Sequence, residues 1–143
     1  MKRKGSVFQL ADERDDDIMQ NYIKLLNEAK KINLYQIRCR LVNMPSKRFW
    51  VTAERASIVI SSMQDGDKLL KMHPTKREMY NEIYRRVQEC RQKDPTQSIY
   101  NIVSNVISSP APKFYLTPGS TRMIIYKIKR EWIRKNMQGL YRL

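Results

Sequence analysis

The stretch PAPKFYLTPGSTRMIIYKI, from Pro110 to Ile128, restates a pattern that the chain has already used from Pro45 to Met63, as PSKRFWVTAERASIVISSM. Both stretches extend backwards without a gap, so that residues 33–63 lie over residues 98–128, with apolar positions kept in register. The identical pairs are Tyr35/Tyr100, Ile37/Ile102, Pro45/Pro110, Phe49/Phe114, Thr52/Thr117 and Ile60/Ile125. This agreement predicts an internal duplication.

Apolar residues at helical spacing predict three helices in each copy, and hence an all-α fold. The first and second helices are expected at 12–31 and 34–43 in the first copy, and at 75–93 and 96–108 in the second. Thr52 and Thr117 are suited to cap the third helices, and Pro118 fits a first helical position, where its missing N–H costs nothing. Five acidic residues open the first helix, where the helix dipole favours negative charge: Asp12, Glu13, Asp15, Asp16 and Asp17.

The connectors between second and third helices, PSKRFWV and PAPKFYL, combine proline, basic residues and aromatic residues. Proline cannot continue the preceding helix, and the alternation that follows predicts short extended segments that pair as a ribbon across a pseudo-dyad. We therefore expect two three-helix units that share one core. The expected organisation is a basic arm at 1–11, a first three-helix repeat at 12–63, a linker at 64–74, a second repeat at 75–138 with a basic C-terminal helix, and a tail at 139–143.

The charge balance indicates an anionic partner. The 143 residues include 28 Lys and Arg against 14 Asp and Glu, giving a net charge of +14, while 41% apolar residues are typical of a globular protein. Residues 110–143 hold eight of the basic residues and only one acid, Glu131, so half of the net excess lies in the last quarter of the chain. This is the distribution expected of a nucleic-acid-binding surface.

Little in the sequence predicts catalysis. The single histidine, His73, has no recognisable nucleophile paired with it, and no phosphate-binding glycine loop or metal-ligand spacing occurs. We therefore expect no enzyme activity, no cofactor and no metal. Cys39 and Cys90 fit no disulfide framework and suggest a reducing cytoplasm. No apolar run approaches the roughly 20 residues of a membrane span.

A helical wheel of the last helix separates an apolar stripe from a basic side. Ile124, Ile125, Ile128 and Trp132 form the stripe and are expected in the core. The other side is expected to bind nucleic acid, since Lys and Arg neutralise phosphates and Tyr can stack on bases. It comprises Arg122, Tyr126, Lys127, Lys129, Arg130 and Arg134.

The two copies differ on this side. Serines stand in the first copy where the second has Arg122, Tyr126 and Lys127, namely Ser57, Ser61 and Ser62. The second repeat is thus predicted to bind nucleic acid. The first repeat is predicted to be a scaffold, a weaker nucleic-acid-binding unit, or a surface that binds another molecule of this protein or a different protein. The connectors add Lys113, Lys47 and Arg48 as nucleic-acid contacts. Their aromatic residues are expected to pin the turn to the core, and the alternative is stacking on bases, for which Trp50 and Tyr115 are the better candidates.

A capped third helix with a basic outer face, preceded by a helix and a turn, resembles the helix-turn-helix class of DNA-binding proteins, here in tandem over 33–63 and 98–137. The segments RFWVTAERA and PAPKFYLTPGS also make the chain similar to small basic accessory proteins of phages and mobile elements. The resemblance implies a regulatory or architectural protein that binds double-stranded DNA. The alternatives are a structural or interaction protein with an acidic partner, and an RNA-binding accessory protein.

Overall fold

The computed structural model describes residues 6–141, and this part of the chain contains helices and no strand. The helices are α1 (Ser6–Glu28), α2 (Leu34–Val42), α3 (Ala53–Gln64), α4 (Pro74–Lys93), α5 (Ile99–Ile107) and α6 (Pro118–Tyr141). The prediction of an all-α fold is confirmed for this range. Within it, no helix combines the length and the apolar character needed to cross a bilayer.

The first helix differs from the prediction at its start. It begins at Ser6 rather than at Asp12, so the end of the expected arm belongs to α1, while residues 1–5 lie outside the described range. The acidic residues therefore lie within the helix, and the first turn contains none of them. The argument from the helix dipole was wrong. Asp17 instead is buried and accepts a hydrogen bond from the backbone N–H of Lys47, at 2.9 Å, which fastens the first connector to α1.

The capping residues behave as predicted. The hydroxyl of Thr52 accepts the N–H of Arg55 at 3.2 Å and starts α3, and the hydroxyl of Thr117 accepts the N–H of Ser120 at 3.0 Å and starts α6. Each bond satisfies one of the backbone donors that a helix N-terminus leaves free. The two third helices thus begin at equivalent points of the repeated pattern.

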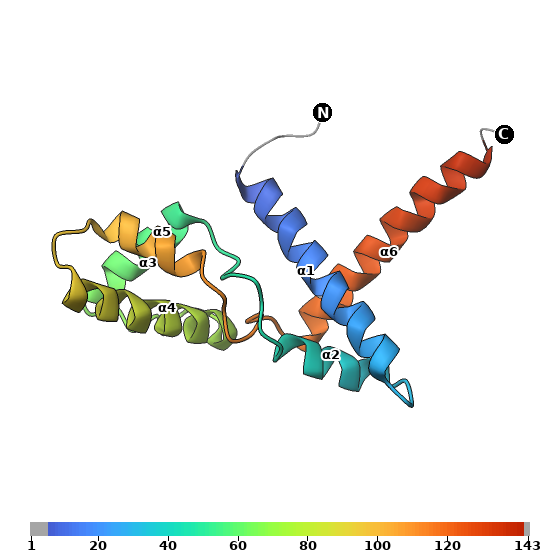
Figure 1. Cartoon of the computed structure of the whole chain (residues 1–143), viewed down its shortest axis with the longest axis horizontal. Coiled ribbons are helices and arrows are strands. Elements are labelled where there is room, and N and C mark those ends of the chain that lie inside the picture. The colour runs from blue at the N-terminus through green and yellow to red at the C-terminus, as the bar shows by residue number, and fades with distance from the viewer. Residues whose placement is uncertain (1–5, 142–143) are drawn as a thin grey trace.

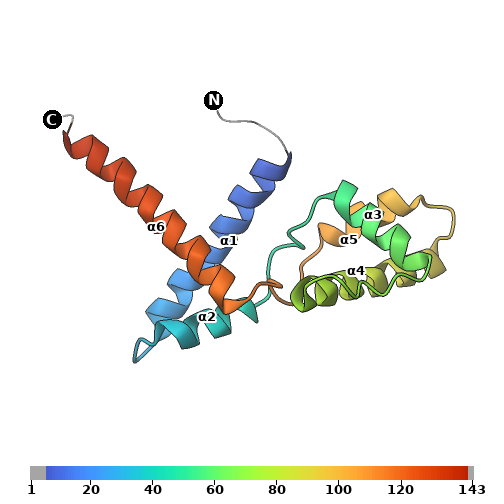
Figure 2. The ribbon, with the colours of Figure 1, turned by 180° about the vertical axis from the view of Figure 1, so that it is seen from behind.

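The helices do not pack in sequence order. Contacts join α1, α2 and α6 into one unit and α3, α4 and α5 into another, and the described residues show no packing of α2 on α3 or of α5 on α6. Figures 1 and 2 show the two units side by side, joined by the two connectors. The expectation that each unit is made of consecutive helices was therefore wrong. Each third helix crosses over and packs on the first two helices of the other half of the chain.

The buried side chains form two clusters rather than the single shared core that we expected. One cluster belongs to the α1/α2/α6 unit and consists of Ile18, Tyr22, Leu25, Ile37, Leu41, Phe114 and Ile125. The other belongs to the α3/α4/α5 unit and includes Phe49, Ala56, Ile60, Ile83, Val87, Ile102 and Val103. Each connector therefore delivers its phenylalanine to the unit that its third helix joins.

The connectors cross as a short antiparallel pair. Ser46 and Ala111 form a bridge in which each N–H donates to the carbonyl of the other, at 3.0 Å. Phe49 N–H donates to Ile107 O at 3.0 Å, and Phe114 N–H donates to Val42 O at 3.1 Å. These two bonds are equivalent under the 65-residue offset of the repeated pattern. The predicted pairing of the connectors is confirmed in its smallest form, a single bridge.

The crossing follows from the local chemistry of the connectors. Pro45 and Pro110 cannot extend the helices that precede them, and the residues that follow become extended. An extended chain advances about 3.3 Å per residue. The connectors are therefore long enough to carry α3 and α6 away from their own halves, where a turn of three residues would have kept them in place.

Candidate nucleic-acid interface

The last helix leaves its unit after three turns. Thr121 and Ile125 are buried against α1 and α2, whereas every side chain from Lys129 to Met137 is exposed. Lys129 marks the crossing with α1, because its Nζ lies 5.1 Å from the ring centre of Tyr22. Beyond it α6 continues to Tyr141, a length of about 18 Å at 1.5 Å per residue. This free end projects from the unit in Figure 1.

Trp132 is therefore not in the core. It lies on the same side of α6 as Ile125, as the wheel indicated, but 66% of its surface is exposed. The stripe packs only where a neighbouring helix is present, and α6 has already passed α1 at this point. The packed part of the stripe consists of Ile125, which is buried, with Ile124 and Ile128, which are half-buried.

All the predicted contacts on α6 are exposed and lie along one helix. They are Arg122, Tyr126, Lys127, Lys129, Arg130 and Arg134. The ion pairs found among the described residues involve α1, α4 and Lys113, and none involves a cation of α6. Lys135, which belongs to neither of the two predicted sets, is also exposed here, although its angle on the helix matches that of the apolar stripe. It was missed because a wheel gives the angle of a residue and not the point at which packing ends.

The charges of α6 repel one another. Arg130 and Arg134 are four residues apart, and Lys127 and Arg130 are three apart, so each pair lies on one side of the helix. Glu131 is the only acid in the helix and cannot offset them all. An anion bound along this side would relieve the repulsion, since like charges at these spacings destabilise a helix.

The connector lysines are engaged within the chain. Lys113 is half-buried, forms an ion pair with Glu78, and has its Nζ 5.6 Å from the ring centre of Tyr115. Lys47 is exposed, and its Nζ donates to Gln20 Oε1 at 3.2 Å. Both charges are thus partly occupied, as is Lys129 of α6, whose Nζ also donates to the hydroxyl of Tyr22 at 3.4 Å.

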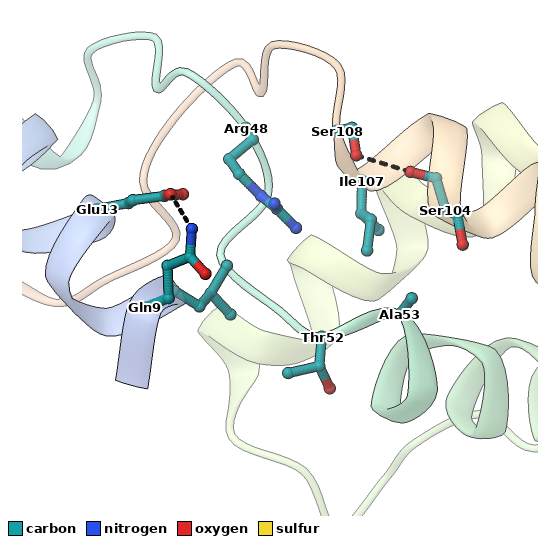
Figure 3. Close-up of a pocket in the computed structure, with 9 residues that line it drawn as sticks. Gln9, Glu13, Arg48, Thr52, Ala53, Ser104, Ile107 and Ser108 are labelled. Carbon is teal, nitrogen blue, oxygen red and sulfur yellow. Dashed lines mark hydrogen bonds between the residues drawn. The ribbon is translucent and has the colours of Figure 1, made fainter. Parts of the chain in front are cut away.

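Arg48 lines a cavity of about 330 Å³ between the two units and points into it, as Figure 3 shows. Its Nε donates to Phe49 O at 3.1 Å, and its Nη2 donates to Val51 O at 3.2 Å. Burial lowers the pKa of Arg48, and the nearby carboxylate of Glu13 acts in the opposite direction. The guanidinium therefore shapes the first connector and lies apart from the free cations of α6.

The two stacking candidates are not free to meet bases. Trp50 is half-buried against the α1/α2/α6 cluster, and Tyr115 is only 8% exposed. The ring of Tyr115 stacks on Phe49, with centroids 6.0 Å apart, and its backbone adopts a positive φ of 57°. Burial raises the pKa of Tyr115 to about 12, and the Glu82 carboxylate adds to the shift. The expectation that the connector aromatics pin the turn to the core is confirmed, and the alternative of stacking on bases is not supported.

The remaining chemistry is sparse. His73 precedes α4, and its Nδ1 accepts the N–H of Thr75 at 3.2 Å, which is a capping role. Across residues 6–141 no cluster of three or more His, Cys, Asp and Glu side chains could hold a metal ion. Comparison with protein-family models, with curated proteins and with solved structures gave no match to this chain.

Proposed function

We propose that this protein is a non-enzymatic, double-stranded DNA-binding protein, regulatory or architectural, that makes its main contact through α6. The observation that carries the proposal is that Arg130, Arg134 and Lys135, beyond the crossing with α1, are exposed and form no ion pair with another described residue. The major groove of B-DNA, about 12 Å wide, admits an α-helix when the outer side of the helix is exposed. The free half of α6 meets that condition.

We also propose that the chain arose by duplication and that α1 and α2 act as the scaffold that presents α6. Two observations support the duplication: connector hydrogen bonds recur at a 65-residue offset, and so do buried residues such as Ile18 and Ile83 or Ile37 and Ile102. Presentation of a basic third helix by two others is what the likeness to helix-turn-helix proteins leads us to expect. The free thiols of Cys39 and Cys90 are consistent with a cytoplasmic protein.

A salt titration tests the proposal. Fluorescence anisotropy would measure the affinity of the protein for duplex DNA, duplex RNA and single strands between 50 and 200 mM salt, values chosen as the range in which phosphate contacts weaken about a thousandfold or more. We expect log affinity for duplex DNA to fall linearly with log salt, and duplex DNA to bind most tightly. Tighter binding of RNA would change the proposed substrate, and no duplex binding at low salt would overturn the proposal.

A further inference from the structure

The exposed side of α6 carries an apolar seam in addition to its cations. Met123, Tyr126, Ile133 and Met137 are 65%, 62%, 54% and 43% exposed, which is unusual for large apolar side chains on one helix. Together with Arg130 they follow one another at intervals of three, four, three and four residues. This is the a/d spacing of a coiled coil, and we call these five residues the α6 seam.

The residues beside the seam are basic on both flanks. With Met123 as position a, the e positions are Lys127 and Arg134, and the g positions are Arg122, Lys129 and Asn136. Glu131, the only acid of the helix, falls at position b and lies away from the seam. In a coiled coil, the charges of the residues at e and g determine which partner helix binds, because they form ion pairs between the helices.

The flanks argue against pairing with a second copy. In a parallel pair of α6 helices, Arg122 would face Lys127 of the second copy, and Lys129 would face Arg134. Each contact would join like charges, which destabilises pairing. A partner with acidic residues at e and g would turn the same contacts into ion pairs.

We propose that the α6 seam binds an amphipathic helix of a partner protein, with apolar residues at a and d and acidic residues at e and g. The helix would cover the apolar side chains and neutralise both flanks. Arg130, at the central a position, would favour a polar or acidic residue opposite it, which fixes the register. Because the partner helix and DNA would both cover α6, they would exclude each other, and the partner would act as an antagonist of the proposed DNA binding.

A pair of synthetic peptides tests this inference with the whole protein. The acidic probe carries Ile at a, Leu at d and Glu at e and g over three heptads, and the control probe carries Lys at e and g. We expect the acidic probe to bind and the control probe not to bind. Ile133→Gln with Met137→Gln should weaken the acidic probe by about tenfold or more, the scale set by losing two anchor side chains of an interface. The same variant should leave DNA affinity within about twofold, since phosphate contacts carry that affinity.

Arg130→Leu separates the two ligands further. It removes from the seam a charge that a bound helix would bury, and it removes a cation from the DNA contact, so it should raise affinity for the acidic probe and lower affinity for DNA. No binding of the acidic probe, or equal binding by the wild type and the Ile133/Met137 variant, would overturn this inference while leaving the DNA proposal intact. A dimer of the protein alone that the same variant dissociates would also overturn it, because a second copy would then cover the seam.

Discussion

The helices α3 and α6 begin at equivalent points of the repeated pattern and then diverge. Both start after a capping threonine, and both bury the residues that the pattern shares, such as Ile60 and Ile125. However, α3 ends after 12 residues, within its unit, whereas α6 continues for 24 and leaves its unit. The positions that the two helices share are buried in the two units. The additional length of α6 carries exposed cations that α3 lacks.

The cations of the two units differ in the same way. On α4, Arg85 lies 2.7 Å from Glu82 and 2.6 Å from Glu89, and Arg86 lies 2.9 Å from Glu82. Among the residues that the structure describes, the cations of α6 form no ion pair of this kind. A count of basic residues therefore overstates the attraction of the α3/α4/α5 unit for an anion. The excess of positive charge is larger on α6, where six cations accompany one acid, than on α4, where six cations accompany three acids.

The largest expected effect is on stability, and each of two substitutions should destabilise a different one of the two units. Phe49→Ala should destabilise the α3/α4/α5 unit, and Phe114→Ala should destabilise the α1/α2/α6 unit, each by about 3–5 kcal/mol, the cost of removing a buried aromatic side chain. Hydrogen exchange read helix by helix would locate the loss of protection. Equal loss in all six helices from either change would show that the units unfold as one.

The next comparison lies within α6. Ile125→Ala should cost about 2–5 kcal/mol because the side chain is buried, whereas Trp132→Ala should stay within about 0.5 kcal/mol because the side chain is exposed. Urea unfolding followed by circular dichroism measures both. If Trp132→Ala were as costly as Ile125→Ala, the end of α6 would have to pack against the protein, and the free helix would be rejected.

A smaller effect on stability is expected from the second connector, where the titration of Tyr115 makes the free energy of unfolding depend on pH. Since burial raises the pKa of Tyr115 to about 12, against about 10 for an unfolded tyrosine, the native state retains a proton that the unfolded chain loses. The stabilisation is present below pH 10 and is lost as the pH rises from about 10 to 12. The free energy of unfolding should therefore fall more steeply between about pH 10 and 12 in the wild type than in Tyr115→Phe. Parallel curves for the two proteins would mean that Tyr115 titrates like a solvated phenol.

Much of the fold followed from local patterns in the sequence. The helices, the caps at Thr52 and Thr117 and the pairing of the connectors depend on neighbouring residues, which a sequence displays directly. The packing of α3 on α4 and α5, and of α6 on α1 and α2, could not be predicted from the sequence. Ile60 and Ile125 would be buried equally well in either unit. The path of the connectors, which pair through the bridge between Ser46 and Ala111, determines which unit each third helix joins.

In the candidate site, too, some features depend on neighbouring residues and could be predicted, whereas others depend on distant segments and could not. The exposure of Arg130 and Arg134 followed from their angle on the helix, and the prediction holds. The exposure of Trp132 depends on where α1 crosses α6, which is a property of two segments far apart in the chain. The position of Arg48 could not be predicted for a related reason, since its guanidinium is held by carbonyl groups of a connector whose path only the fold defines.

The central claim is that free charge on α6 binds DNA, and two variants with the same net charge test it. Arg130→Gln with Arg134→Gln removes two exposed cations from α6, and Lys76→Gln with Arg91→Gln removes two exposed cations from α4. None of the four forms an ion pair with another described residue, so the two variants differ in where the charge is lost. At low salt we expect the α6 variant to lose about tenfold or more in affinity for duplex DNA, and its salt slope to fall by about 2, with the α4 variant close to wild type. Equal losses in the two variants, with both still folded, would show that binding follows net charge and would contradict the account.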